Sequence, residues 1–480
     1  MRLQKILDKI KYSDIVNFED KEIFGASNNS SQIQENFIFF AVKGSTFDGI
    51  RFIDDAVKNG SRVVFHESDI QNFVNNVTYV RVPNLRSFET TVSSEIFDNP
   101  QKKLKFIGIT GTNGKTSTAY IIWKALNKSG RKCGLIGTVL YHDGKKEFTP
   151  THTTPDSFVL NKYFSSMVDN GCEFCVMEVS SHSLVMNRVD HIKFDISLFT
   201  NLTQDHLDFH KSMEEYGKAK SILFDSLTKD NGSIVYDCKS SNLNLVISED
   251  KSNHFIINRD EFLKIENYKQ TRNGIEITFS GKLNFTLKSN LFGLFQVNNI
   301  SLGVSVLYLL NYSEKEIASL VNTTTSIPGR MEKCDLNNPL VFIDYAHTPD
   351  ALDKLLNSVK DIPHGKIISV FGCGGNRDRL KRPLMGKIAS ENSDITIITS
   401  DNPRNENPEE IIDEIFTGIS NNFETIRESD RKKAIQLAIK LARPDDLIVI
   451  AGKGHENYQE IKGVKYPFSD KEIVEELCLK

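Results

Sequence analysis

The sequence predicts an α/β protein of three domains in which mostly parallel sheets are covered by helices. Its 480 residues, 39% hydrophobic and 25% charged, suit about three ordinary globular domains. From residue 104 onward, short apolar runs alternate with helical patterns, which is typical of βα units. A pattern typical of antiparallel strands interrupts this alternation once. The alternation of strands and helices resumes after a turn near residue 327. We expect domains at residues 1–102, 103–326 and 327–480.

The first domain is predicted to be a small α/β domain. A strand at Asn36–Lys43 ends in a glycine turn, a helix covers Asp54–Asn59, and the next strand is Gly60–Phe65. The polar segment Asn99–Lys103 contains a proline, which favours a domain boundary there.

The central domain is predicted to combine a mostly parallel sheet with a small antiparallel hairpin. The hairpin strands Gly274–Phe279 and Leu283–Leu287 flank Ser280-Gly281, and a helix follows over Gln296–Leu310. The parallel strands are expected at Phe106–Ile109, Cys133–Val139, Phe174–Val179, Ile196–Phe199 and Ser233–Tyr236.

The C-terminal domain is predicted to be doubly wound and Rossmann-like, and it begins after the turn Ile327–Arg330. Its strands are expected at Leu340–Tyr345, Lys366–Phe371, Ile395–Thr399 and Leu447–Ala451, and its helices near 349–360, 408–419 and 430–442.

Bulk properties exclude several classes of protein. A net charge of −4 gives no reason to expect nucleic acid or an anionic membrane as partner. No apolar run approaches the length of a membrane-spanning helix, and the charged N-terminus lacks the apolar core of a signal peptide. Seven cysteines in a long chain argue against a disulfide framework. We expect a cytoplasmic protein without membrane insertion.

A strand, a glycine-rich turn and a helix lie in succession at residues 105–128. This context indicates a phosphate-binding loop with the short form Gly111-x-x-Gly114-Lys115-Thr116. Backbone N–H groups and the helix N-terminus would face the phosphates, Lys115 would reach the β- and γ-phosphates, and Thr116 or Ser117 would bind Mg²⁺. The alternative is an ordinary βα turn. We expect the central domain to be a P-loop ATPase.

Two further strand ends in the central domain carry polar groups. Glu178 closes an apolar strand just before His182, where a carboxylate suits Mg²⁺, although it could instead face solvent. The segment after the strand ending at Phe199 is dense in polar side chains, which favours a site over a capped helix start. These side chains are Asn201, Asp205, His206, Asp208 and His210.

Three strand ends of the C-terminal domain carry charged loops shaped by glycine or proline. Arg377 follows one strand, Arg404 a second and Glu456 a third. Arginines suit carboxylates and a glutamate suits an ammonium group. The three loops together predict a site for a zwitterion.

Six motifs in order along the chain resemble those of the Mur ligases, the ATP-dependent amide-forming enzymes of peptidoglycan precursor synthesis. The motifs are Gly111–Thr116, Glu178–His182, Thr200–Asp208, Pro328–Glu332, Asp344–His347 and Lys453–Glu456. The resemblance covers essentially the whole chain. It implies a domain that binds the UDP substrate, a central ATPase and a C-terminal domain that binds an amino acid.

Within the family, the chain resembles enzymes that add meso-2,6-diaminopimelate to the D-glutamate γ-carboxylate of UDP-N-acetylmuramoyl-L-alanyl-D-glutamate. The resemblance implies ATP and Mg²⁺. We expect the chain to act as a monomer. It implies ATP binding by Gly111, Thr112, Asn113, Gly114, Lys115, Thr116, Ser117, Asn299 and Arg330. It implies binding of the UDP-dipeptide by Ser30, Thr153, Thr154, Ser180 and Arg188. It implies binding of diaminopimelate by Arg377, Asp401, Asn402, Pro403, Arg404, Gly452 and Glu456.

The resemblance also assigns a metal site and a modified lysine. The expected catalytic residues are Lys115, Glu178, His206 and Lys220, and the expected Mg²⁺ ligands are Thr116, Glu178, His206 and Lys220. Taken alone, Lys220 belongs to an amphipathic helix and would be solvated. In the family, the matching lysine reacts with CO₂, which would turn Lys220 into an anionic carbamate (N6-carboxylysine).

Within the family, an arginine after Asp-Asn-Pro resembles the enzymes that use diaminopimelate rather than L-lysine, and Arg404 holds that position here. Diaminopimelate carries one more carboxylate than lysine at its far end, and an arginine can pair with that group. The lysine-adding ligase of the same family, folylpolyglutamate synthase and a nucleotide-gated binding module without ligase activity stay open as alternatives. Two departures from the family are Asn29-Ser30-Ser31, for Asp-Ser-Arg, and Gln296, for Asn.

Overall fold

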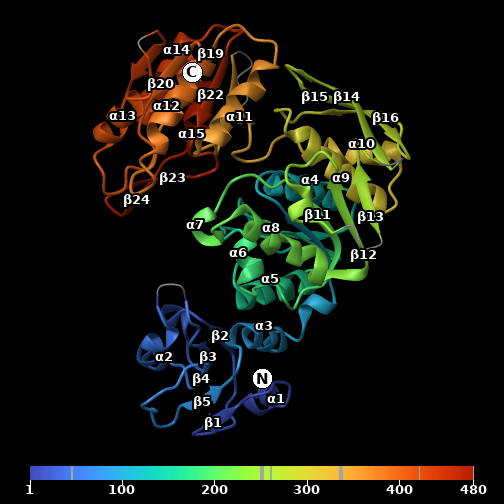
Figure 1. Cartoon of the computed structure of the whole chain (residues 1–480), viewed down its shortest axis with the longest axis vertical. Helices are drawn as coiled ribbons and strands as arrows, with labels where there is room; N and C mark the ends of the chain where they lie inside the picture. Colours follow the sequence, from blue (N-terminus) through green and yellow to red (C-terminus); the bar gives the residue numbers. More distant parts are fainter. Residues whose placement is uncertain (45–46, 249–252, 260–261, 335–338, 421, 479–480) are drawn as a thin grey trace. The chain divides into compact units, whose positions relative to one another are not determined.

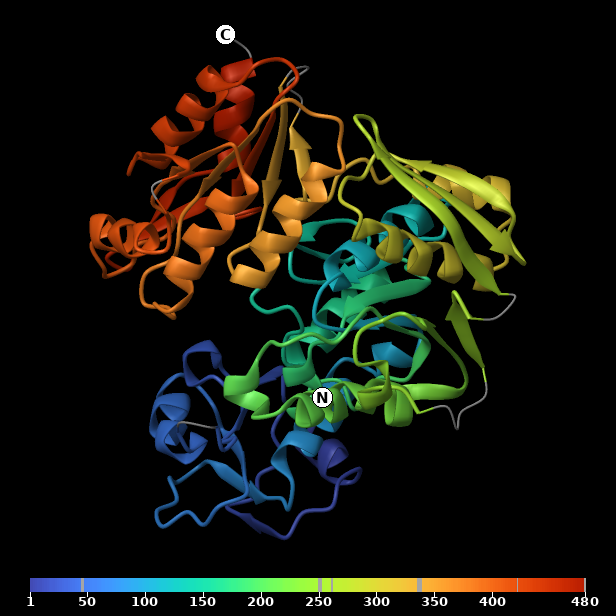
Figure 2. The ribbon, with the colours of Figure 1, turned by 45° about the horizontal axis from the view of Figure 1, so that its top comes forward.

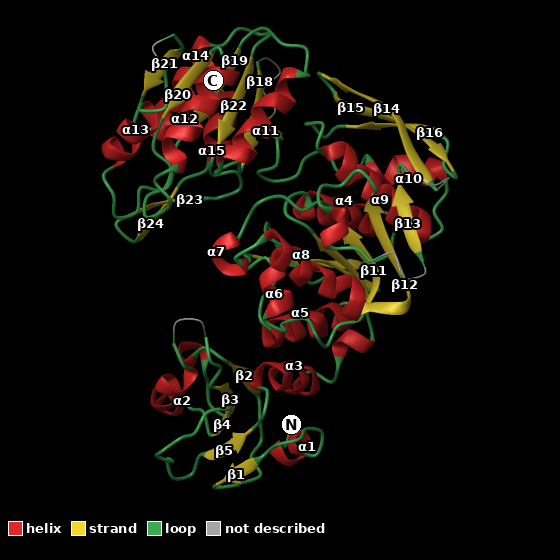
Figure 3. Cartoon of the chain, viewed as in Figure 1, coloured by secondary structure: helices red, strands yellow, loops and turns green. Residues whose placement is uncertain are grey.

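The computed structural model describes residues 1–44, 47–248, 253–259, 262–334, 339–420 and 422–478. The chain forms two compact units, 1–258 and 259–480 (Figure 1). Both units combine helices with sheets (Figure 3), so the predicted α/β class is confirmed. The predicted domain boundaries after residues 102 and 326 stay predictions. Among the described residues, no helix is long and apolar enough to cross a membrane.

The first sheet of the N-terminal unit has the strand order β1-β5-β4-β3-β2. Strands β2 to β5 are parallel, and β1 joins the edge in the opposite direction. Successive residues of β3 point to opposite faces, one packed against α1 and α3 and the other against α2. The elements are α1 Leu3–Leu7, β1 Asp14–Val16, β2 Gly25–Ser27, β3 Phe37–Phe40, α2 Ile53–Lys58, β4 Val63–His66, β5 Thr78–Arg81 and α3 Leu85–Ile96.

The second sheet of this unit carries the phosphate-loop sequence. Its strand order is β13-β12-β11-β6-β10-β7-β8-β9, parallel from β13 to β7 and antiparallel over β8 and β9. The carboxyl ends of β6, β10 and β11 therefore meet at one edge. The strands are β6 Lys105–Thr110, β7 Cys133–Ile136, β8 Tyr141–His142, β9 Glu147–Phe148, β10 Phe174–Glu178, β11 Phe194–Phe199, β12 Thr228–Asp237 and β13 His254–Ile257. The helices are α4 Lys115–Lys128, α5 Ser157–Asp169, α6 Ser181–Val185, α7 Leu207–His210 and α8 Met213–Ile222.

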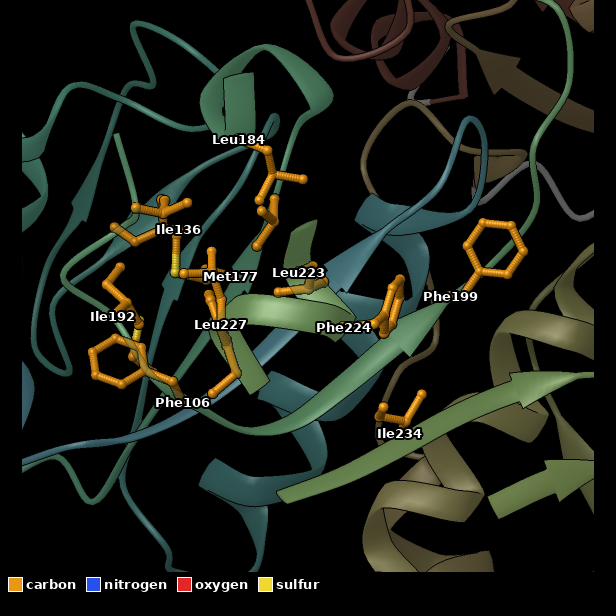
Figure 4. Packing of buried hydrophobic residues seen from close by; sticks show 14 of the residues in the cluster. Phe106, Ile136, Met177, Leu184, Ile192, Phe199, Leu223, Phe224, Leu227 and Ile234 are labelled. Atoms are coloured by element: carbon orange, nitrogen blue, oxygen red, sulfur yellow. The ribbon is translucent and has the colours of Figure 1, made fainter. Parts of the chain in front are cut away.

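A continuous apolar core supports that edge (Figure 4). Phe106 of β6 and Met177 of β10 are fully or almost fully buried and belong to the same cluster as Phe224, just beyond α8. Phe199 of β11 packs edge-on against the Phe224 ring, with 6.3 Å between the centroids. Fully burying one such side chain contributes about 1.5–3 kcal/mol. This packing makes the strand ends a rigid base for the loops that follow them.

The second unit begins with an antiparallel sheet of order β14-β15-β16. The predicted hairpin is confirmed as β15 and β16, and β14 is a third strand that the sequence prediction missed. Strand β14 is largely exposed and polar, so it lacks the alternation that reveals a strand. The elements are β14 Leu263–Thr271, β15 Gly274–Gly281, β16 Phe285–Ser289, α9 Gln296–Leu309 and α10 Glu314–Val321.

The predicted doubly wound sheet follows, with the strand order β17-β18-β22-β19-β20-β21. All neighbours except β17 and β18 are parallel. Alternate residues of β18 pack against α11–α13 on one face (Figure 2, orange helices) and against α14 and α15 on the other. The strands of this sheet are β17 Glu332–Cys334, β18 Leu340–Asp344, β19 Ile367–Phe371, β20 Ile395–Ile398, β21 Glu424–Arg427 and β22 Leu447–Ala451. A separate antiparallel pair consists of β23 Tyr458–Ile461 and β24 Val464–Pro467. The helices are α11 Pro349–Lys360, α12 Lys381–Asn392, α13 Pro408–Phe416, α14 Arg431–Leu441 and α15 Asp470–Cys478.

Two local expectations need correction. The strand expected at Cys133–Val139 ends at Ile136. Just beyond it, N–H of Thr138 donates to the Glu178 carboxylate instead of to a neighbouring strand. The prediction also omitted α12. Its Pro383 lies in the first helical turn, where a missing N–H is tolerated.

A buried ion pair joins α14 to α15. The guanidinium of Arg431 donates to both carboxylate oxygens of Asp470, at 2.8 and 2.7 Å, and both side chains have no exposed surface. Replacing Asp470 by Ala leaves the arginine buried without its anion, so we expect a loss of about 3–5 kcal/mol in local stability. Hydrogen exchange of the α14 and α15 amides would measure it. Lys432→Ala, which removes an exposed ion pair with Glu476, is the control and should cost less than about 1 kcal/mol. Equal effects of the two substitutions would contradict this prediction.

A second prediction concerns the buried carboxylate of Glu89 on α3. Burial, with the nearby Asp156 carboxylate, raises the pKa of Glu89 from 4.5 to about 7. Its Oε1 atom accepts a 3.2 Å hydrogen bond from Nδ2 of Asn28. A raised pKa means that the folded state favours the protonated form, so stability is lost as pH rises from 4.5 to about 7.

Glu89→Gln keeps the hydrogen-bond acceptor and removes the charge. We expect the variant to exceed the unsubstituted protein in stability by about 3 kcal/mol near pH 8, and to match it near pH 4.5. Urea unfolding of the full chain at both pH values would measure the difference. A stability difference that does not change with pH would refute the assignment to Glu89.

Candidate active site

The turn between β6 and α4 has the backbone conformation of a phosphate-binding loop. Gly111 and Gly114 have φ angles of 144° and 87°, which residues with a side chain rarely adopt. A methyl group on Gly111 would lie 1.9 Å from Oγ1 of Thr200, so no larger residue fits. The ammonium group of Lys115 donates to the carbonyl oxygens of Gly111 and Thr112, both at 2.9 Å. This cation therefore lies over the turn at the N-terminus of α4, where an anion is favoured.

The segment after β11 braces this turn. Oγ1 of Thr200 donates to the carbonyl oxygen of Asn113 at 2.6 Å, and Oδ1 of Asn201 accepts from N–H of Asn113 at 3.1 Å. Oγ1 of Thr112 donates to the carbonyl oxygen of Thr203 at 3.1 Å. The polar residues predicted as a site thus begin with residues that hold the phosphate loop in shape.

The carboxylate of Glu178 lies next to the start of α4. It is only 1% exposed and accepts from Oγ1 of Thr116 at 3.0 Å. It also accepts from N–H and Oγ1 of Thr138 at 2.7 and 3.1 Å. Oγ1 of Thr138 is in turn 3.0 Å from Oγ1 of Thr153. Thr138 was not among the predicted site residues, although its place directly after β7, at the edge that Glu178 occupies, was a usable signal.

Lys220 is buried and does not face solvent as an isolated amphipathic helix would suggest. It is 1% exposed, and its Nζ atom donates to the carbonyl oxygen of Gly111 at 2.9 Å. It also lies 4.4 Å from the centroid of the Tyr216 ring. Burial, and then the nearby charge of Lys115, lower the pKa of Lys220 well below its ordinary value. The buried amine is therefore prone to lose its proton beside the phosphate loop.

The predicted histidine lies at the rim of this site. His206 is an exposed residue with a positive φ of 53°, and its ring packs edge-on against His182 at 4.9 Å between centroids. Nε2 of His210 is 2.9 Å from Oγ of Ser181, and burial lowers the pKa of His210 to about 4. Among the described residues, no group of three or more His, Cys, Asp or Glu side chains is arranged to hold a metal ion. A magnesium site here would need oxygens from a bound phosphate as well.

Three of the residues predicted to bind the UDP-dipeptide are in direct contact. Oγ1 of Thr154 accepts from N–H of Ser180 at 3.1 Å, and Nη1 of Arg188 donates to the carbonyl oxygen of Thr154 at 3.0 Å. Nε of Arg188 pairs with Asp156 at 2.9 Å. Ser30 begins a short 3₁₀ turn after β2, where its carbonyl oxygen accepts from Nδ2 of Asn59 at 2.9 Å. Among the described residues, it makes no hydrogen bond to Thr154, Ser180 or Arg188.

The remaining residues predicted to bind ATP lie in the second unit. Asn299 is buried in α9, and its Nδ2 atom donates to Oε1 of Gln296 at 2.8 Å. Gln296, which replaces the asparagine usual in the family, therefore contacts Asn299, which matches the family pattern. The guanidinium of Arg330 lies 5.4 Å from the centroid of the Tyr345 ring.

In the second unit, both predicted carboxylate-binding arginines lie near Gly374. A methyl group on Gly374 would lie 2.9 Å from Nη1 of Arg404 and 3.8 Å from Cγ of Arg377. Nη1 of Arg404 donates to the carbonyl oxygen of Gly375 at 2.8 Å. The loops after β19 and β20 touch so closely that a methyl group on Gly375 would lie 1.9 Å from the carbonyl oxygen of Pro403. The Arg404 guanidinium and the aliphatic stem of Arg377 therefore both lie beside Gly374.

A buried lysine holds the predicted glutamate beside them. Nδ2 of Asn402 donates to Oε2 of Glu456 at 2.8 Å. The fully buried Nζ of Lys453 lies 3.2 Å from both Oδ1 of Asn402 and Oε2 of Glu456. A methyl group on Gly452, whose φ is 115°, would lie 2.7 Å from Oδ2 of Asp401. These contacts bring the predicted residues of the loops after β20 and β22 together.

Arg382 of α12, which the sequence analysis did not single out, locks two of the loops. It has no exposed surface, and it donates to both carboxylate oxygens of Glu406 at 2.9 and 3.0 Å. It also donates to Glu414 at 2.8 Å and weakly to the carbonyl oxygen of Gly374 at 3.4 Å. Glu406 in turn accepts from N–H of Asn376. This arginine links the two segments that carry Arg377 and Arg404.

Comparison with known proteins gives matches along the chain. The Mur ligase middle domain matches residues 109–307, and the Mur ligase glutamate ligase domain matches residues 329–454. The chain is 43% identical to the UDP-N-acetylmuramoyl-L-alanyl-D-glutamate–2,6-diaminopimelate ligase 1 of Clostridium acetobutylicum, over 99% of each chain. It is 41% identical to the corresponding ligase of Aquifex aeolicus, over 98% of this chain and 96% of the relative.

Solved structures with a similar fold include a ligase of the same family and a folylpolyglutamate synthase. A UDP-N-acetylmuramoyl-L-alanyl-D-glutamate–2,6-diaminopimelate ligase superposes with a TM-score of 0.70 at 28% identity, covering 100% of this chain and 98% of the other. A folylpolyglutamate synthase of Mycobacterium tuberculosis gives a TM-score of 0.61 at 17% identity over 76% of this chain and 92% of that one, a likeness of fold alone. With two matching domain models and identity above 40% over nearly its whole length, this chain belongs to the Mur ligase family.

Proposed function

We propose that this Mur ligase is an ATP-dependent enzyme that joins meso-2,6-diaminopimelate to the D-glutamate γ-carboxylate of UDP-N-acetylmuramoyl-L-alanyl-D-glutamate. It would act in the cytoplasm as a monomer, in the synthesis of a peptidoglycan precursor. The observation that carries the choice of amino acid is the position of the Arg404 guanidinium beside Gly374, on the loop that also carries Arg377. Two arginines suit the two carboxylates of diaminopimelate, whereas L-lysine would leave one of them unpaired. The names of the relatives from Clostridium acetobutylicum and Aquifex aeolicus support this proposal.

The first step is phosphoryl transfer. The γ-carboxylate of D-glutamate attacks the γ-phosphorus of ATP, ADP leaves, and an acyl phosphate forms. Lys115 and the backbone N–H groups of residues 111–117 bind the phosphates and offset the charge on the transferring group. Thr153, Thr154, Ser180 and Arg188 orient the UDP-dipeptide.

The residues around Glu178 fit Mg²⁺, which would neutralise charge on the phosphates when bound. The fit rests on a carboxylate that is 1% exposed and that, within the described residues, pairs with hydroxyl and amide donors and with no lysine or arginine. Such a buried anion is suited to a cation. Glu178, Thr116, His206 and Lys220 as a carbamate would hold the metal.

The second step forms the amide. The neutral amine at the L-centre of diaminopimelate attacks the acyl carbon. The tetrahedral intermediate then breaks its bond to phosphate, and the proton lost from nitrogen leaves with hydrogen phosphate. Arg377, Arg404 and Glu456 orient the amino acid, with Asp401, Asn402, Pro403 and Gly452 shaping the loops. The acyl phosphate is hydrolysed by water, so the residues around it must exclude solvent.

We keep the predicted three domains as part of the proposal: residues 1–102 for the UDP substrate, 103–326 for ATP and 327–480 for the amino acid. The gap between the two domain matches, which end at residue 307 and begin at residue 329, supports the second boundary. Asn299 and Arg330 flank that gap and are proposed to contact ATP.

The proposed amino acid is tested with Arg404→Ala. Removing one partner of a charge pair costs about 3–5 kcal/mol, so kcat/KM for meso-diaminopimelate should fall by at least about 100-fold. The KM for ATP should stay unchanged. Product formation with the UDP-dipeptide and each amino acid would measure this, with the exposed Arg443→Ala as control. Amide formation with L-lysine but not with diaminopimelate would refute the proposed function.

Carboxylation of Lys220 is tested separately from activity. A neutral lysine attacks CO₂ and releases one proton, forming a carbamate, and the buried amine of Lys220 is poised for this reaction. The protein in ¹³C-bicarbonate should show a carbamate carbon resonance that is lost in Lys220→Arg. The exposed Lys218→Arg on the same helix should retain it. Persistence of the signal in Lys220→Arg would overturn the assignment.

A further inference from the structure

Asp156 occupies the position directly before helix α5, where an aspartate ordinarily caps a helix with its side chain. Its backbone takes part in the helix, because its carbonyl oxygen accepts from N–H of Leu160 at 2.9 Å. Within the described part of the chain, its carboxylate makes no capping hydrogen bond. The carboxylate instead lies 2.9 Å from Nε of Arg188, and the two side chains are 32% and 19% exposed. This carboxylate is therefore used for the arginine and not for the helix.

Arg188 is held by its backbone and by one end of its guanidinium. Its N–H donates to the carbonyl oxygen of Ser183 at 2.9 Å, directly after Asn187, whose φ is 57°. Nη1 donates to the carbonyl oxygen of Thr154 at 3.0 Å, and Nη2 contacts Sδ of Met186, a weak acceptor, at 3.5 Å. Each Nη atom carries two hydrogens and makes one recorded contact, so donors remain for an anionic group of a substrate.

Helix α3 of the first sheet supports the start of α5. Oγ of Ser93 lies 3.4 Å from Oγ of Ser157, and both side chains are buried. Glu89 is one helical turn before Ser93 on α3. Burial, and then the nearby Asp156 carboxylate, raise the pKa of Glu89. The carboxylate that pairs with Arg188 therefore projects from a packed junction of two helices.

We propose that Asp156 is a positioning residue for the UDP-dipeptide, on which it acts through Arg188. The ion pair restricts the arginine side chain before the substrate arrives. Binding loses affinity when a long side chain must be immobilised at that moment, and it avoids this cost when the side chain is already held. The inference rests on the proposed function, which assigns Arg188 to the UDP-dipeptide, and deepens it by naming what orients the arginine.

Asp156→Asn removes the charge and keeps a residue that tolerates the N-cap position equally well. Calorimetry without ATP should show that the UDP-dipeptide binds about three- to tenfold more weakly, the cost of immobilising one arginine. KM for the UDP-dipeptide should rise by a similar factor, while kcat and KM for ATP stay unchanged. Asp156→Glu keeps the charge and should restore part of the lost affinity.

A double substitution shows whether Asp156 acts through Arg188. In the Arg188→Ala protein, the further change Asp156→Asn should leave the Kd of the UDP-dipeptide unchanged, because both substitutions remove the same contact. Asp169→Asn, at the exposed opposite end of α5, is the control and should change neither Kd nor KM.

Three results would overturn this inference alone. Equal rises in KM for ATP and for the UDP-dipeptide in Asp156→Asn would show a general loss of structure. Unchanged binding would show that the ion pair has no role. Tighter binding would show that Asp156 competes with the substrate for Arg188. An unsubstituted enzyme that neither binds nor uses the UDP-dipeptide would instead refute the proposed function itself.

Discussion

A buried carboxylate holds the candidate site of the first unit together. Glu178 ends β10 and accepts hydrogen bonds from Thr116, at the start of the phosphate-loop helix, and from Thr138, after β7. Parallel strands deliver their carboxyl ends to one edge, so segments far apart in sequence reach this one anion. A carboxylate in that position is costly unless it is hydrogen-bonded or bound to a cation. The group that organises the loops is therefore also the group best suited to a metal.

The second unit uses buried cations for the same purpose. Lys453 holds Asn402 and Glu456, and Arg382 joins Glu406 to the glycine turn after β19. Removing either cation would leave buried acceptors without donors, which is more costly than losing an exposed ion pair. The side chains proposed to bind the substrate are thus positioned by Lys453 and Arg382, which need not touch the substrate themselves. Burial fixes the positions of these side chains, since an unpaired charge or hydrogen-bonding group is costly in a low-dielectric environment.

Much of the fold was predictable from local patterns. The helix Lys115–Lys128 and the hairpin that became β15 and β16 both follow from periodicity and turn residues, which act over short distances. Strand β14 was missed because its exposed, polar residues lack alternation. The strand after Cys133 was predicted too long because a side chain from β10 competes for its backbone. The first miss reflects a strand without a local pattern, and the second a distant contact that outweighed a local preference.

The sequence by itself determined the family motifs, their order, and the loops that carry Lys115, Glu178 and Arg404. It could do so because glycine turns and strand ends leave a local signature. Only the tertiary structure decided the state of Lys220, whose amine is buried against Gly111, 109 positions earlier in the chain. It also decided that Arg188 pairs with Asp156. Desolvation and ion pairing depend on which distant segments become neighbours, and no helical or strand periodicity records that information.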